Sequence, residues 1–241
     1  MTKKERIINL NISSRLAVLI ILVLATISCE DDPVKADDPI DQTTVTDIDG
    51  NVYETIQIGD QEWMAENLKV THYRDGTAIT NVSDNIAWTV TTTEAYCIYN
   101  NNANNEVDTY GALYNWYAVD DSRNIAPEGW HIPTEAEWQV LIDNLGGDEV
   151  AGGKMKETGT SHWVSPNIGA TNESGFTALP SGYRSYADGS YGYMGYVTSF
   201  WSATLSGSSG AWVRRLGYTD SDLRLSHSNK EGGTAIRCLR D

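Results

Sequence analysis

Hydrophobic and polar positions alternate with a period of two over residues 52–58, and a Gly-Asp pair then separates this segment from residues 61–64. Two such segments around a short turn predict a β-hairpin that opens the folded domain. Apolar segments at residues 210–216 and 234–239 predict two further strands. The second of these ends the chain, so we expect it to lie inside a sheet, where neighbours on both sides keep it ordered.

A helix is predicted where the apolar spacing changes from alternation to the helical period. Thr134 is expected to cap this helix and Glu137 to complete a capping box, because each side chain then accepts a bond from the other residue's backbone N–H. Apolar residues follow at helical spacing before a Gly-Gly pair: Trp138, Leu141, Ile142 and Leu145. We predict one amphipathic helix of about eleven residues, with structural roles for Trp130 and Trp138. The aromatic segment 110–119 is also expected to be helical.

The chain begins with a basic segment followed by an unbroken apolar run at residues 16–25. The run is too short to cross a bilayer comfortably, and its basic flank is typical of a secretory signal. The small residue before Cys29 resembles the bacterial lipobox, although Thr26 stands where that motif usually has leucine. We predict a lipoprotein signal peptide over residues 1–28 and lipidation of Cys29. Ordinary signal-peptidase cleavage and an uncleaved anchor are the alternatives.

Acidic residues and prolines dominate the segment after Cys29, and almost none of its side chains could enter a core. We interpret residues 29–46 as an acidic, disordered tether and residues 47–241 as one folded domain. Acids directly after a lipidated cysteine resemble the export signal of lipoproteins of the Bacteroidota. This likeness implies a lipid anchor in the outer membrane with exposure at the cell surface, the periplasmic face being the alternative.

Composition adds a fold class and excludes one class of partner. Eight Trp, thirteen Tyr and 21 Gly beside two Phe favour many short strands and turns, so we expect a β-rich fold. Lys and Arg number 17 against 33 Asp and Glu, a net charge of -16. Such a surface repels phosphate backbones, and nucleic acid is not expected as a partner.

Six short stretches, in this order along the chain, resemble the Fibrobacter succinogenes major paralogous domain family: residues 47–53, 63–68, 111–116, 129–134, 200–202 and 236–241. Residues 133–138 and the closing Arg237–Cys238 are also similar to the formylglycine-generating-enzyme branch of the C-type-lectin-like fold. These resemblances imply an α+β, C-type-lectin-like fold. Short twisted antiparallel strands, one or two flanking helices, and paired N- and C-terminal strands are then expected.

Cysteine chemistry of the formylglycine-generating type would need two thiolates close together to hold copper(I). Beyond Cys29 the chain has only Cys97 and Cys238, and Ala126 stands where relatives frequently carry a cysteine. We therefore predict structural roles for both cysteines, no catalytic residue, and a protein that is not an enzyme. The sequence allows two states for this pair: a disulfide between Cys97 and Cys238, or two buried free thiols.

The sequence contains no complete metal-binding motif that would support a bound cofactor. The four histidines, at positions 72, 131, 162 and 227, lack the helical spacing with one another or with an acid that favours zinc. Residues 47–51 alternate carboxylates before a glycine, as calcium loops do, but the later ligands of such a loop are missing. A turn is the better interpretation. We predict neither a metal site nor a cofactor. Calcium binding is the alternative, but no sequence motif supports it.

The C-terminal region mixes aromatic side chains and arginines with small polar residues, which is typical of binding surfaces. The ligand-binding residues predicted there are Trp201, Trp212, Arg214, Tyr218, Asp222, Arg224 and Asn229. In the alternative interpretation the two tryptophans are core anchors and the arginines offset an acidic surface. We expect this face to bind a polysaccharide or a protein outside the cell. A structural or accessory subunit of an envelope assembly, or a formylglycine-generating-type enzyme, are the alternative functions.

Replacing Cys29 with Ala is expected to abolish acylation and to release nearly all of the protein from washed membranes, because several acyl chains are what makes such anchoring stable. Membrane fractionation followed by blotting measures the effect. The control Cys97→Ala keeps the lipidated position and should remain bound. Retention of the Cys29 variant in washed membranes would contradict the lipobox assignment.

Overall fold

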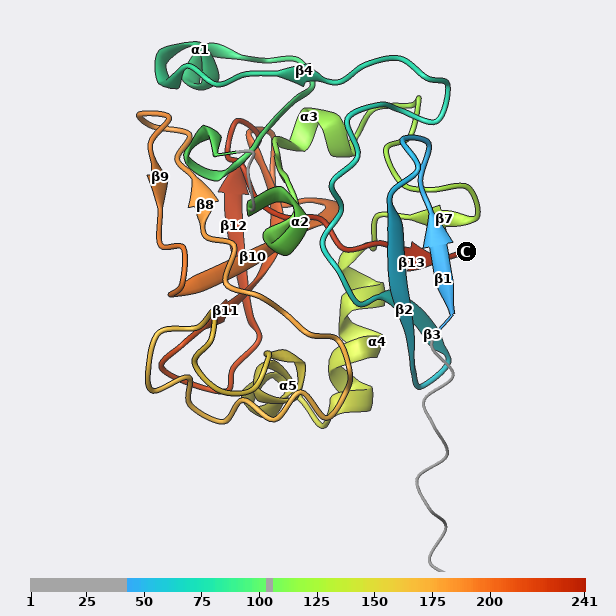
Figure 1. Cartoon of the computed structure of the whole chain (residues 1–241), viewed down its shortest axis with the longest axis vertical. Coiled ribbons are helices and arrows are strands. Elements are labelled where there is room, and N and C mark those ends of the chain that lie inside the picture. The colour runs from blue at the N-terminus through green and yellow to red at the C-terminus, as the bar shows by residue number, and fades with distance from the viewer. Residues whose placement is uncertain (1–42, 103–105) are drawn as a thin grey trace, which may run out of the picture. The chain divides into compact units, whose positions relative to one another are not determined.

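A five-stranded antiparallel sheet brings together the first and last strands of the structure (Figure 1). The computed structural model describes residues 43–102 and 106–241. The strands of this sheet are, in spatial order, β1 (Thr44–Thr46), β2 (Val52–Ile58), β3 (Gln61–Met64), β13 (Leu239–Arg240) and β7 (Trp130–His131). The predicted hairpin is confirmed as β2 and β3, whose register pairs Ile58 with Gln61.

The C-terminal strand lies inside its sheet, as expected, but it is shorter than predicted. Only Leu239 and Arg240 form β13, which pairs with β3 and β7 and not with β1. Upstream, Thr234 and Ala235 make single bridges to Tyr114 and Phe200. The segment passes from one set of strands to another, so it cannot form one continuous ladder.

A second antiparallel sheet contains the predicted strand at residues 210–216. Its strands are β10 (Val197–Leu205), β11 (Gly210–Gly217) and β12 (Arg224–Asn229). Two smaller sheets complete the set: β4 (Thr80–Asn81), β5 (Ala95–Cys97) and β6 (Leu113–Tyr114), and the hairpin β8 (Tyr183–Arg184) with β9 (Tyr191–Gly192). The architecture is therefore mixed α+β, with most of its regular structure in sheets.

The predicted amphipathic helix is α4 (Glu135–Leu145), and both bonds of its capping box are present. Gly146 ends it at a φ of 97°, a left-handed conformation that suits glycine. The described chain has further short helices: α1 (Asn85–Val90), α2 (Glu106–Tyr110), α3 (Trp116–Val119), α5 (Asp148–Met155) and the 3-10 turn η1 (Tyr99–Asn101). Only α3 and the last residue of α2 fall within the segment 110–119 that was expected to be helical.

Two expectations at element boundaries are corrected. The segment 110–119 is not one helix, because Gly111 adopts a φ of 74° where a Cβ atom would lie 2.6 Å from that of Asn67. Strand β6 and the short helix α3, capped by Asn115, follow instead. The predicted disordered tether also ends earlier than residue 46, because Thr44–Thr46 pair with β2 as strand β1.

The turn between β1 and β2 is organised by Asp47, as the turn interpretation of residues 47–51 expects. Its carboxylate accepts hydrogen bonds from the backbone N–H groups of Asp49 (3.0 Å) and Asn51 (2.9 Å) and from the Tyr53 hydroxyl (2.6 Å). These donors occupy the oxygens that a calcium loop would offer to the ion.

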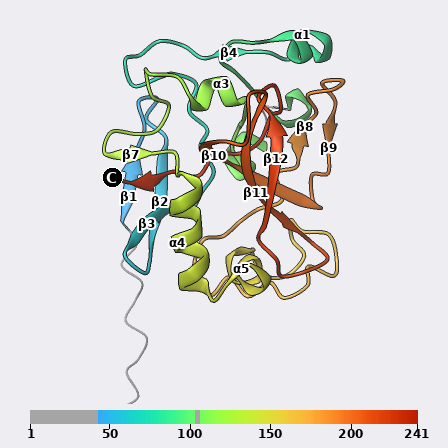
Figure 2. The same cartoon turned by 180° about the vertical axis from the view of Figure 1, so that it is seen from behind.

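Helix α4 packs between the two larger sheets through its buried apolar side chains, among which Trp138 contacts both sheets. Trp138 lies 4.7 Å from the Trp63 ring of β3 and 5.8 Å from the Phe200 ring of β10. Figures 1 and 2 show the five-stranded sheet on one side of α4 and the three-stranded sheet on the other. A large buried aromatic ring of this kind contributes about 3–5 kcal/mol relative to alanine, so Trp138 has the structural role expected of it.

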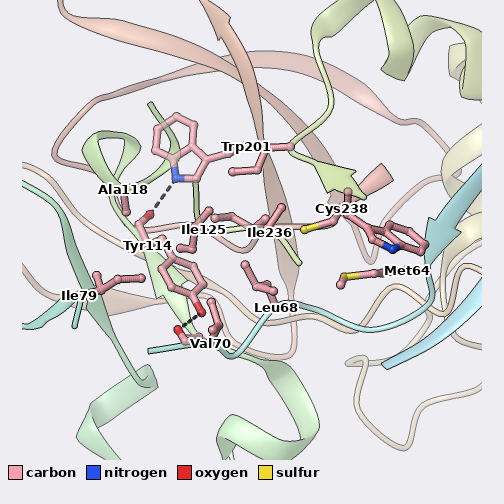
Figure 3. Close-up of a cluster of buried hydrophobic side chains, with 14 of the residues drawn as sticks. Met64, Leu68, Val70, Ile79, Tyr114, Ala118, Ile125, Trp201, Ile236 and Cys238 are labelled. Atoms are coloured by element: carbon pink, nitrogen blue, oxygen red, sulfur yellow. Dashed lines mark hydrogen bonds between the residues drawn. The ribbon is translucent and has the colours of Figure 1, made fainter. Parts of the chain in front are cut away.

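A second cluster of buried side chains joins the loops to the sheets (Figure 3). Tyr114 donates its hydroxyl to the Val70 carbonyl (2.7 Å), and the Trp201 indole N–H donates to the Tyr114 carbonyl (2.7 Å). Trp130 and Cys238 belong to this cluster, whereas Cys97 lies in a smaller one. Both cysteines are free thiols. The disulfide alternative is therefore wrong, and burial raises the pKa of both thiols.

Buried cations connect the loops to one another. Arg237 is 1% exposed, stacks on the Phe176 ring, and donates to the carbonyls of Met64, Phe176 and Thr177. Its Nε also donates to the Asn67 side chain at 2.6 Å. One guanidinium thereby joins the end of β3 to a loop and to the C-terminal segment, and it satisfies carbonyl groups that would otherwise be buried without a donor.

Lys156 and Arg184 make the same kind of connection. The Lys156 Nζ, on a fully buried residue, donates to the carbonyls of Ile168 (2.9 Å), Gly217 (3.0 Å) and Asp220 (2.7 Å). Arg184, 1% exposed, donates to carbonyls between β4 and α1 and to that of Gly189. Both therefore connect segments that are distant in sequence, and most of the carbonyls that they bind lie in loops.

The predicted signal peptide, Cys29 and most of the tether lie outside the described residues. Over residues 43–102 and 106–241, no helix combines the length and the apolar character needed to cross a membrane.

The buried ammonium group of Lys156 predicts a specific pH dependence of stability. Burial lowers its pKa to about 8, whereas an unfolded lysine has a pKa of about 10.4. Between these values the unfolded chain keeps the proton that the folded chain has released, so this group's contribution to the free energy of unfolding rises with pH. The unfolding free energy of the wild type minus that of Lys156→Met should therefore rise by about 2 kcal/mol from pH 7.5 to 9.5.

Urea denaturation of both proteins at the two pH values measures this difference, and the subtraction cancels the titration of thiols and tyrosines that both proteins share. A difference that stays constant or falls would contradict the assignment.

Candidate functional site

The register of the three-stranded sheet divides its side chains between two faces. Residues directly opposite each other in an antiparallel pair point to the same face. Arg215 of β11 pairs with Ser199 of β10 and with Arg224 of β12, and Val213 pairs with Ser226. These residues share the face that turns away from α4.

The opposite face of the same sheet is used by the helices. Arg214, paired with Phe200 in the register, is 2% exposed and forms ion pairs with Glu135 of α4 and with Asp148 of α5 (3.0 Å). Burial raises the pKa of Glu135, and the guanidinium partly offsets this. Arg214 thus fixes both helices to the sheet and offers no surface to a ligand.

The seven sequence-predicted ligand residues are not all brought together. Trp201 is fully buried in the core, where its indole N–H is bonded to Tyr114 (Figure 3), so it has the position of a core anchor. Trp212 is half-buried and paired with His227, on the same face as Arg214. Asn229 is half-buried at the end of β12, opposite Gly210.

The remaining three residues meet beside the sheet. Arg224 is exposed and forms ion pairs with Asp220 (2.7 Å) and with Asp222 (3.3 Å). Tyr218 is half-buried, and its ring meets that of Tyr196 edge to face at 5.3 Å. Tyr218 and Arg224 line the same hollow, with Asp222 beside Arg224, and the charge of Arg224 is already neutralised by neighbouring acids.

Two adjoining hollows open on the face that carries Arg215. Hollow A, of about 360 Å³, lies between the β8–β9 hairpin and the sheet and includes Tyr183, Tyr186 and Ser199 in its lining. Hollow B, of about 520 Å³, is lined in part by Tyr193, Tyr196, Tyr218 and Arg224. Arg215 and Ser226 line both hollows, so they form the divide between them.

Exposed tyrosines surround the hollows, and those before residue 197 were not among the ligand-binding residues predicted from the sequence. Tyr193 is 57% exposed, Tyr186 48% and Tyr196 42%. The rings of Tyr183 and Tyr193 stack at 5.5 Å with an interplanar angle of 18°. Tyrosines alternating with Gly and Ser over residues 183–196 are the same compositional signal that was used for residues 201–229, so this segment could have been included.

Tyr193 also has an unusual backbone conformation. Its φ of 62° lies in the left-handed region that bulky side chains rarely adopt. Such strain is found most often at functional positions, where the surrounding structure maintains it. Here it holds the exposed ring against Tyr183 at the edge of the two hollows.

Histidines outside this face are held by carboxylates. His72 is bonded to Asp49 at 2.5 Å and His162 to Glu157 at 2.8 Å. His131 lies between Glu137 of the capping box and the Asp241 side chain. Within the part of the chain that the structure describes, no group of three or more His, Cys, Asp or Glu side chains is placed to hold a metal ion.

Comparison with known proteins identifies the family. The family model of the Fibrobacter succinogenes major domain matches residues 56–240. The chain belongs to this family. The resemblance drawn from the six sequence stretches is thereby confirmed, and the matched range of the Fibrobacter succinogenes major domain includes the whole three-stranded sheet and both hollows. No curated protein matches the chain.

Proposed function

We propose that this chain is a lipid-anchored lipoprotein of the outer membrane, exposed at the cell surface, whose Fibrobacter succinogenes major domain binds an extracellular polysaccharide. The observation that carries the proposal is the pair of hollows bordered by exposed tyrosines and Arg215. Tyrosine rings give apolar contact to the face of a sugar, while hydroxyl and guanidinium groups orient it by hydrogen bonds.

The size and position of the hollows support this assignment. Their volumes, about 360 and 520 Å³, are those of pockets that bury small ligands or single units of a polymer. Both are open along one face, and Arg215 connects them, so neighbouring sugar units of one chain have two adjacent places to bind. We also propose that the domain is a variant of the C-type-lectin-like fold, which the pairing of β13 with the N-terminal hairpin supports.

In this proposal the acyl chains on Cys29 attach the protein to the membrane. A protein with a net charge of -16 is repelled by anionic membrane surfaces, and acyl chains on Cys29 would overcome this repulsion. The acidic residues after Cys29 support export to the outer face. The binding domain would then stand away from the membrane on its tether.

One observation favours the accessory-subunit alternative. Helix α1 exposes Ile86 (76%) and Val90 (71%), and neighbouring exposed apolar side chains are typical of contacts with another protein. For the formylglycine-generating alternative the geometry is unfavourable, because Cys97 and Cys238 lie in separate core clusters and do not form the required pair of thiols.

A screen of the purified chain against plant, host and microbial polysaccharides, with and without calcium, tests the proposal. Saturable binding is expected. Tyr193→Ala and Tyr218→Ala should each weaken it about threefold to tenfold, because each removes an aromatic contact with the ligand. Ile48→Ala removes an exposed apolar side chain outside both hollows and should leave the affinity unchanged.

Unchanged affinity in both tyrosine variants would move the site away from these hollows. Failure to bind any polysaccharide in either condition would contradict the proposal and favour a protein partner, which cross-linking on intact cells would then identify.

A further inference from the structure

We propose that hollow A binds the anionic group, a carboxylate or a sulfate, of an acidic polysaccharide, with Arg215 as its principal partner. The inference rests on the proposed function and adds to it the chemical class of the ligand. It assigns different tasks to the two hollows, the anionic group to hollow A and the uncharged part of the sugar chain to hollow B.

Arg215 differs from the other arginines of the described chain in having no partner. Those at positions 123, 214, 224 and 240 form ion pairs with carboxylates. Those at positions 74, 184 and 237 donate to backbone carbonyls. Within the same described ranges the Arg215 side chain makes neither an ion pair nor a hydrogen bond, although the full chain has 33 acids against 17 bases. Its fork of donors is left free to bind a carboxylate or sulfate.

The residues around Arg215 are arranged for an anion. Ser199 lies directly opposite Arg215 in the sheet, and Ser226 lies opposite the neighbouring Val213 on the same face. Within the described chain neither serine hydroxyl makes a hydrogen bond, so both can donate to a ligand oxygen beside the guanidinium. Ser199 is only 6% exposed and belongs to the lining of hollow A.

Hollow A is also free of negative charge. Its lining contains no Asp or Glu, whereas it includes Arg184, whose buried guanidinium is bonded to carbonyls and to no carboxylate. Two cations and no acid in the lining favour a positive potential in this hollow, in an otherwise acidic molecule. Asp188, in the turn of the β8–β9 hairpin, is not part of the lining and accepts from Ser190.

Hollow B has the opposite character. Asp220 is part of its lining, and Asp220 with Asp222 neutralises Arg224 at its edge. An anionic group there would be repelled, whereas the tyrosine rings suit an uncharged sugar face. A polymer that carries acidic groups at intervals satisfies both hollows at once.

Two matched pairs of polymers test the proposal: polygalacturonate with its carboxyl-reduced form, and dextran sulfate with dextran. Affinity is measured by calorimetry with the full-length chain. At least one acidic polymer should bind about tenfold or more tightly than its neutral counterpart, and the pair that shows this identifies carboxylate or sulfate as the source. Arg215→Gln should reduce binding of that acidic polymer about tenfold to a hundredfold, and it should weaken binding of the neutral polymer much less, so that most of the preference is lost.

Two further variants separate the site from general charge effects. Arg215→Lys keeps the positive charge but loses the planar guanidinium group, which can bind an anion through two N–H donors. Its affinity for the acidic polymer should therefore lie between those of the wild type and Arg215→Gln. Arg240→Gln makes the same change in net charge at an exposed arginine of the five-stranded sheet, and it should keep the full preference. Because Arg215 has no partner to lose, the melting temperature of its variants should equal that of the wild type.

Equal affinity for the acidic and neutral members of both pairs would overturn the anion site, as would a preference that survives Arg215→Gln or that Arg240→Gln removes equally. The proposed function would stand in each of these cases, provided that the broader screen returns a bound polysaccharide. Absence of binding both to these polymers and throughout that screen would instead overturn the proposed function itself.

Discussion

Backbone carbonyl groups in loops need hydrogen-bond donors, and in this fold buried cations supply them. Arg237, Arg184 and Lys156 each donate to several carbonyls of loop segments that are distant in sequence. A carbonyl left without a donor in the interior would cost about 1–3 kcal/mol. Long side chains with several donors therefore allow a chain with short strands and many loops to have an ordered interior.

Two of these cations, Arg184 and Lys156, support the segments that form the candidate site. Arg184 connects the β8–β9 hairpin to the segment before α1, and this hairpin forms one side of hollow A. Lys156 holds the carbonyls of Gly217 and Asp220, which belong to the lining of hollow B. The tyrosines and Arg215 are thus presented by segments already fixed in place, so binding would require little further ordering of the chain.

Local signals in the sequence predicted the local elements, while the distant contacts could not be inferred. The capping box of Thr134 and Glu137 identifies the start of α4 because both partners lie within one turn. Helix α5 was missed because its Gly152 weakens the helical signal; that glycine is required where a Cβ atom would lie 2.4 Å from the Asp222 carbonyl oxygen. Of the predicted ligand residues, Tyr218 and Arg224 line a hollow, but Arg214 faces the helices. Arg214 and Arg215 are adjacent in the sequence, and only the strand register determines which of them faces the helices and which faces the hollows. That register depends on tertiary pairing.

Hydrogen–deuterium exchange of the full-length chain, with and without its most tightly bound polysaccharide, tests the location of the site without any mutation. We expect slower exchange at amides of residues 183–199 and 213–228, which border the two hollows. Amides of α1 and of the turn between β1 and β2 should be unaffected. Protection confined to the separate hollow that Arg74 and Glu128 line, with none around Arg215, would show that the polysaccharide does not bind in hollows A and B.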